Sequence, residues 1–157
     1  MVMYGKPFMK VSARGAALIG ASFLLSVLSQ AASAAVVEIA VTGVVNARGH
    51  IHVDLCTEDT FLKDNCPYEG SAVATPGSTL VRITGVPPGQ YAAQVFHDEH
   101  DDGHVHRTIL GIPTEPIGFS NNAPLHLHGP KFKEAAFAVA HGVERITLRL
   151  RDVLKSL

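Results

Sequence analysis

The residues best suited to chemistry lie in the segment 97–106, which holds four histidines and four acidic residues. Imidazole and carboxylate groups together are the ligands that zinc, copper and nickel take in proteins. Asp and Gly are also frequent in solvated turns, so the same segment is consistent with a hydrogen-bonded surface loop. If the segment binds a metal, the candidate ligands are His97, Asp98, His100, Asp102, His104 and His106.

Part of this segment matches the start of a calcium-binding loop. Asp98, His100 and Asp102 occupy alternate positions and Gly103 follows at once, as the oxygen ligands and the glycine do in such loops. Histidine is a poor ligand for a hard cation, and the twelfth position holds Ile109 in place of the usual Glu. A divalent metal at this loop is therefore expected to be zinc, copper or nickel rather than calcium.

The next segment, residues 111–123, is rich in Pro, Gly and Asn and is predicted to form a long, ordered connection. Ordered long loops often bind ligands on a rigid scaffold, although Asn side chains also satisfy the backbone of their own loop. The candidate residues for a small ligand here are Glu115, Ser120, Asn121 and Asn122.

Motifs of known enzyme classes are absent from the sequence. It has no Gly-x-Ser-x-Gly, no His-Glu-x-x-His and no glycine loop of the kind that holds phosphates. This favours a non-enzymatic binding or accessory domain, with a metal-binding or metal-handling protein as the alternative. A weaker alternative is a small hydrolase that uses His97 with Glu115 or Ser120.

The N-terminus has the three parts of a secretory signal peptide. An uncharged apolar run, residues 16–28, follows three basic residues and precedes Ala32-Ser33-Ala34, which fits the small-x-small cleavage pattern. The run is too short to span a bilayer, so we expect residues 1–34 to be removed, with no membrane insertion afterwards. The predicted location of the protein is the periplasm or the cell exterior.

The remaining residues, 35–157, are enough for one domain with its own core. The signal segment holds three of the thirteen basic residues and no acid, which leaves ten basic against fourteen acidic residues, a net charge near −4. An acidic domain without a basic stripe argues against a nucleic-acid partner. The partners that remain are a small ligand, a glycan or a protein of the cell envelope.

Cys56 and Cys66 are the only two cysteines in the chain. In an exported protein, an even number of cysteines predicts a disulfide. The alternative is a thiolate metal site, but the spacing matches no known ligand pattern and the chain has no second pair.

Beyond residue 35, apolar residues recur with a period of two, as in Val37, Ile39 and Val41. Short alternating runs separated by Gly and Pro predict an all-β domain, a single antiparallel β-sandwich of about seven strands. Residues 46–49 and His141-Gly142 suit hairpins joining the first two and the last two strands. Residues 131–135 are expected to form one helical turn.

Several motifs of the chain occur together in one known family. They are Leu55-Cys56-Thr57, Gly85-Val86-Pro87-Pro88-Gly89, Phe96-His97-Asp98, Leu110-Gly111-Ile112-Pro113-Thr114-Glu115, and Gly118-Phe119-Ser120-Asn121-Asn122-Ala123. In this order they resemble the bacterial exported family called domain of unknown function 2141. The resemblance implies a periplasmic or secreted β-sandwich, immunoglobulin-like or transthyretin-like, and implies no activity.

Members of that family usually carry a loop of the form Asp-x-Asn-x-Asn-Gly-x-x-Asp after the His-Asp pair. In this chain His100 stands at the first Asn position, Asp102 at the second, and His106 at the last Asp. The departure replaces oxygen ligands with imidazoles, and it therefore favours a softer metal than calcium.

Overall fold

The computed structural model describes residues 34–126 and 128–156. Apart from Ala34, the predicted signal peptide lies outside the described residues, so its cleavage stays a prediction. The described part is an all-β sandwich of eight strands, close to the predicted number of about seven. Its helices are single turns, and none has the length and hydrophobicity that a bilayer span requires.

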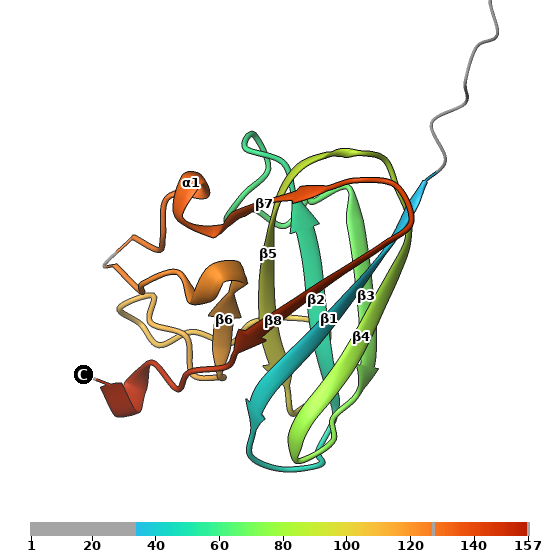
Figure 1. Cartoon of the computed structure of the whole chain (residues 1–157). Helices are drawn as coiled ribbons and strands as arrows, with labels where there is room; N and C mark the ends of the chain where they lie inside the picture. Colours follow the sequence, from blue (N-terminus) through green and yellow to red (C-terminus); the bar gives the residue numbers. More distant parts are fainter. Residues whose placement is uncertain (1–33, 127, 157) are drawn as a thin grey trace, which may run out of the picture. The chain divides into compact units, whose positions relative to one another are not determined.

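The first sheet has three strands in the order β4-β1-β8 (Figure 1). They are β1 (Ala35–Val44), β4 (Gly77–Val86) and β8 (Val143–Arg149). The middle strand, β1, runs antiparallel to β4 and parallel to β8. The sandwich therefore contains one parallel pair, whereas all pairs in the second sheet are antiparallel.

The second sheet has the order β3-β2-β5-β6, with β7 also paired to β5. Its strands are β2 (His50–Cys56), β3 (Tyr68–Val73), β5 (Gly89–Asp98), β6 (Ile117–Phe119) and β7 (Ala136–Val139). One edge of β5 pairs with β2, and its other edge pairs first with β7 and then with β6. The end of β5 is therefore fixed inside the sheet, and the polar segment begins there.

Alternate side chains of the strands point into the space between the two sheets, as the period of two predicts. Burial of these aliphatic side chains supplies the main favourable free energy of folding. Fully buried members of this core are Val37, Ile39, Val41, Ile51, Val53, Leu55, Val81 and Leu148.

The two predicted hairpins are wrong. Residues 46–49 lead from β1, which pairs with β4 and β8, to β2, which pairs with β3 and β5. His141-Gly142 leads from β7, paired with β5, to β8, paired with β1. Both connections cross from one sheet to the other. The hairpin prediction fails because alternation indicates which face of a strand is buried and not which strand is its neighbour.

A second, smaller apolar cluster lies outside the sandwich core. The predicted disulfide is present there, with the sulfur atoms of Cys56 and Cys66 2.12 Å apart. The loop that it closes packs Phe61 against Phe119 and Phe132, with ring centroids 5.8 Å apart in both pairs. This cluster fixes the short helices η1 (Ser120–Asn122) and α1 (Phe132–Ala135), and α1 confirms the predicted helical turn. A third short helix, η2 (Leu154–Ser156), follows β8.

Removing the disulfide should destabilise the domain, because the bridge restricts the unfolded chain over a separation of 10 residues. We expect the Cys56→Ser, Cys66→Ser double variant to lose about 2–3 kcal/mol of unfolding free energy in urea denaturation. A reductant should shift the wild-type midpoint to that of the double variant and leave the variant unchanged. Equal midpoints for oxidised and reduced wild type would contradict a stabilising bridge.

Candidate metal centre after strand β5

The polar loop is organised by the carboxylate of Asp98, the last residue of β5. Asp98 is fully buried, and its oxygens accept backbone N–H groups from His100 at 3.1 Å, Asp102 at 3.3 Å and Gly103 at 2.7 Å. Asp101 and Gly103 take positive φ values of 58° and 76°, so the chain bends tightly around this carboxylate. Asp98 therefore fixes the backbone from which His100 and Asp102 project.

The ionised form of Asp98 is the one that the loop stabilises. Burial by itself would raise the pKa of this carboxyl, but the backbone N–H groups of Gly103, Asp102 and His100 outweigh burial and lower the pKa below its usual value. Both oxygens are engaged by the backbone, and His52 Nε2 lies 3.6 Å from one of them. Because both oxygens of Asp98 already accept backbone hydrogen bonds of the loop, Asp98 is a poor candidate for the metal ligand that the sequence predicts.

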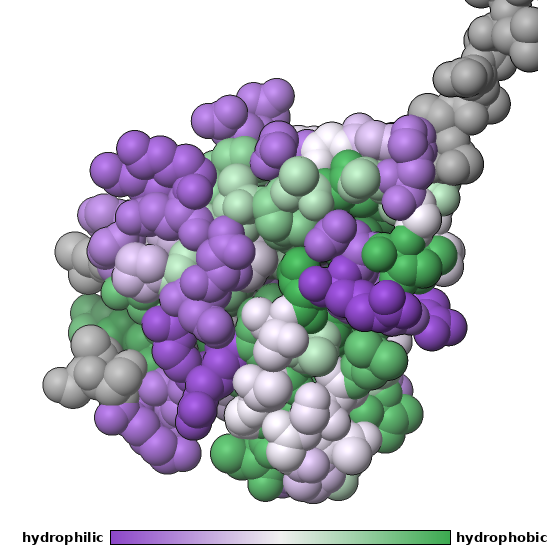
Figure 2. All heavy atoms as spheres, in the orientation of Figure 1, coloured by the Kyte–Doolittle hydropathy of each residue, from purple (hydrophilic) through white to green (hydrophobic). Residues whose placement is uncertain are grey.

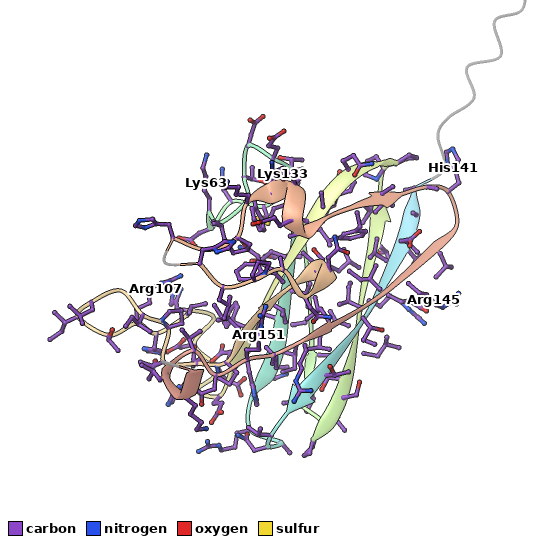
Figure 3. All side chains as sticks on the ribbon, turned by 60° about the vertical axis from the view of Figure 1, so that its left-hand side comes forward. Lys63, Arg107, Lys133, His141, Arg145 and Arg151 are labelled. Atoms are coloured by element: carbon purple, nitrogen blue, oxygen red, sulfur yellow. A yellow bond between two sulfur atoms is a disulfide. The ribbon has the colours of Figure 1, made fainter. Side chains whose placement is uncertain are left out.

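The loop continues into a short hairpin that the sequence pattern does not predict. Arg107 and Pro113 form an isolated bridge, Thr114 N donates to His106 O at 2.9 Å, and Thr108 N donates to Ile112 O at 2.8 Å. Arg107 marks this hairpin in Figure 3. Its two arms bring His106 and Glu115, nine positions apart, to the same end of the hairpin.

Three side chains converge where this hairpin meets the loop. The ligand atoms of His100, His106 and Glu115 all lie within 4.8 Å of one another. His100 Nδ1 is 3.1 Å from Glu115 Oε1, and the backbone N–H of His106 donates to Glu115 Oε2 at 3.3 Å. Glu115 is buried while both histidines are exposed, so the group is anchored from inside and open to solvent. We call these three residues the His2Glu cluster.

The cluster has a carboxylate neighbour in Asp102. Its Oδ2 lies 2.6 Å from His106 Nε2. This hydrogen bond raises the pKa of His106 and lowers that of Asp102, because each partner stabilises the charged form of the other. With Glu115, Asp98 and Asp102 close by, the electrostatic environment of the two imidazoles is negative and suits a cation.

Two histidines predicted as metal ligands lie outside the cluster. His97 is fully buried, and its Nε2 lies 2.8 Å from Arg48 O while its Nδ1 lies 4.0 Å from Glu99. The ring of His104 is exposed and makes no hydrogen bond to the described residues, and only its backbone N–H reaches Asp102. Of the six predicted metal ligands, the structure therefore brings together His100 and His106, with Asp102 beside them.

The predicted small-ligand residues other than Glu115 are bound to the domain's own backbone. Ser120 is buried, accepts from Ala93 N at 2.9 Å and donates to Ala135 O at 2.5 Å. Asn121 Nδ2 donates to Ala136 O, and Asn122 Oδ1 accepts from Arg149 N at 2.9 Å. These contacts join the two sheets through η1, and they place the three residues in a different group from Glu115.

Hydrophilic side chains gather over the loops and α1 at the left of Figure 2. An open surface depression is lined in part by His126 and Glu134, and His126 Nε2 lies 3.4 Å from Glu134 Oε1. It is lined by His126, His128, Gly129, Pro130, Lys131 and Glu134. None of these residues belongs to the His2Glu cluster, which is the one group of metal-ligating side chains with this convergence among the described residues.

The fold and this loop define a β-sandwich domain of the kind that the sequence motifs indicated. Residues 39–147 match the model of the family described as an uncharacterised protein conserved in bacteria, DUF2141. The chain therefore belongs to this family, which confirms the resemblance. No curated protein and no solved structure matches the chain. Because the family description names no activity, function has to be argued from the site.

In the sequence, Glu115 falls among the candidate residues for a small ligand, apart from the candidate metal-ligating histidines. The signal that would have joined them is the sequence 108–111, Thr-Ile-Leu-Gly, which turns the chain back with Gly111 at a φ of 79°. A turn there makes residues 106 and 115 neighbours across a hairpin.

Asp98 gives the first test of this site. In the metal-free protein, we expect Asp98→Asn to lower the unfolding free energy by about 2–4 kcal/mol at neutral pH, because buried N–H donors lose a charged acceptor. The lowered pKa means that this stabilisation is complete above the unfolded pKa of about 3.9 and is lost as pH falls through the folded pKa.

Urea denaturation from neutral pH into acid should therefore show the wild type and the variant converging in acid. Asp59→Asn is the matched control, because Asp59 is exposed and its carboxylate makes no hydrogen bond to the described residues. A difference between wild type and Asp98→Asn that stays constant with pH would contradict the role given to Asp98.

Proposed function

We propose that this protein is an exported, non-enzymatic binding domain of the bacterial cell envelope that takes up a divalent transition-metal ion. The observation that carries the proposal is the convergence of His100, His106 and Glu115. The metal is held on a loop fixed to the sandwich by Asp98 and β5, so the site exists before the ion binds.

The donor set decides between metals. Two imidazoles and one carboxylate suit zinc, copper or nickel, and three protein ligands with an open side are typical of sites where the ion remains accessible. Calcium takes six to eight oxygen ligands, whereas Glu115 is the one oxygen donor in the cluster. The exposure of both histidines favours an ion that enters and leaves from solvent over a permanent structural ion.

Export is supported by two independent features of the chain. The N-terminal segment has the charge, length and cleavage pattern of a signal peptide. The bonded distance between Cys56 and Cys66 fits a compartment in which disulfides persist. Metal ions from the surroundings reach the cell exterior and the periplasm before they reach the cytoplasm, so this location suits a metal-binding role.

Calorimetric titration of untagged protein with zinc, copper and nickel tests the function. We expect one ion per chain at micromolar or tighter affinity, retained against free histidine as a competitor. His100→Ala and His106→Ala should each weaken binding by more than about a hundredfold, since losing even an outer partner of a ligand costs about 10- to 100-fold.

The matched control is His104→Ala, which removes a histidine from the same loop and leaves the His2Glu cluster complete. This variant should bind as the wild type does. If His100→Ala, His106→Ala and His104→Ala all bound with the wild-type affinity, the ion would lie elsewhere and the proposed function would be wrong.

The export proposal has its own test. When the full chain is expressed in bacteria, the protein recovered from the periplasm or medium should begin at or near Ala35, as read by intact mass. The mass should also be two hydrogens lower than that of the reduced chain, because Cys56 and Cys66 are joined. A full-length, reduced protein confined to the cytoplasm would contradict export.

A further inference from the structure

Asp102 contacts the cluster in a way that differs from its predicted role as a metal ligand. Its Oδ2 lies 2.6 Å from His106 Nε2, yet Asp102 is not among the residues whose ligand atoms converge. The Asp102 carboxylate therefore contacts the His106 ring at Nε2, and it does not belong to the group that His106 forms with His100 and Glu115.

The backbone fixes Asp102 in this position. Its Oδ1 accepts the N–H of His104 at 3.0 Å, and its own N–H donates to Asp98 Oδ1 at 3.3 Å. Asp98 in turn is buried at the end of β5. A series of hydrogen bonds thus runs from the sheet through Asp98 and Asp102 to the ring of His106.

With Nε2 of His106 engaged by a carboxylate, Nδ1 is the ring nitrogen left for a metal. Nδ1 is also the nitrogen nearer the backbone, and the backbone N–H of His106 already reaches Glu115. Histidines that bind metals commonly donate their other N–H to a carboxylate, which fixes the tautomer and makes the ligating nitrogen more basic. His100 has no such partner, because its neighbour Glu115 belongs to the cluster.

We propose that Asp102 is a positioning residue of the metal site: it holds the proton of His106 on Nε2, so that Nδ1 binds the ion. This inference rests on the proposed function. It adds that His106 binds the ion through Nδ1 and that the Asp102 carboxylate selects this nitrogen. Asp102 raises the affinity through His106 without contacting the metal.

The test compares Asp102→Asn and Asp102→Ala with the wild type in zinc titrations. We expect the affinity to fall about 10- to 100-fold, with Asp102→Ala the weaker binder, because Asn still accepts one hydrogen bond from Nε2–H. Asp102→Glu keeps a carboxylate and should retain part of the zinc affinity that Asp102→Ala loses. Two-dimensional proton–nitrogen NMR of the zinc-loaded wild type should show His106 protonated on Nε2 and metal-bound through Nδ1.

The matched control is Asp101→Asn. Asp101 is the adjacent residue, and its carboxylate makes the same type of contact, 2.6 Å to His50 Nδ1, outside the cluster. Asn tolerates its positive φ, and the variant removes the same charge from the same loop. It should bind zinc like the wild type, so a loss confined to the Asp102 variants excludes a general effect of loop charge.

The outcomes separate this inference from the proposed function. A wild type that binds no zinc, copper or nickel would overturn both. A wild type that binds through Nε2 of His106, or Asp102 variants that bind as tightly as Asp101→Asn, would overturn the role of Asp102 and leave the His2Glu site standing. Circular dichroism of each variant confirms that the comparison is made between folded proteins.

Discussion

Where β5 ends, the buried carboxylate of Asp98 accepts backbone N–H groups from three residues of the polar loop. β5 pairs on both edges up to Phe96, and Asp98 itself pairs with His50 of β2, so the sheet fixes the backbone from which this carboxylate projects. The positions of His100 and Asp102 follow from these hydrogen bonds. The hairpin that follows brings Glu115 next to His100 and His106. The candidate metal centre therefore depends on the hydrogen bonds of Asp98 and on this hairpin.

Three carboxylates near the site have different roles, and their environments account for the difference. Asp98 is enclosed and satisfied by backbone donors, so it shapes the loop. Glu115 is also buried but faces two imidazoles, and in the proposed site it supplies the negative charge that a cation requires. Asp102 is exposed and hydrogen-bonded to His106, which suits it to orient a ligand. In the proposed site, the same chemical group therefore shapes the loop, binds the ion or positions a ligand, according to its burial and its partners.

The sequence predicted the all-β sandwich and the disulfide, and it singled out the segment that holds two of the three residues of the His2Glu cluster. Alternation of residues such as Val37, Ile39 and Val41 is a local signal, and it correctly identifies strands and their buried faces. Neighbouring strands are chosen by packing across the whole domain, which is why residues 46–49 were wrongly expected to form a hairpin. The cluster was missed for the same reason, since Glu115 joins His100 and His106 only through the fold.

The metal site proposed for this loop consists of His100, His106 and Glu115. Diffraction from crystals of the zinc-loaded protein, recorded on both sides of the zinc absorption edge, tests it most directly. We expect an anomalous peak about 2.0–2.2 Å from one nitrogen of each histidine and from a Glu115 oxygen. A peak at His126 and His128, at His50 and His52, or anywhere away from Glu115 would contradict it.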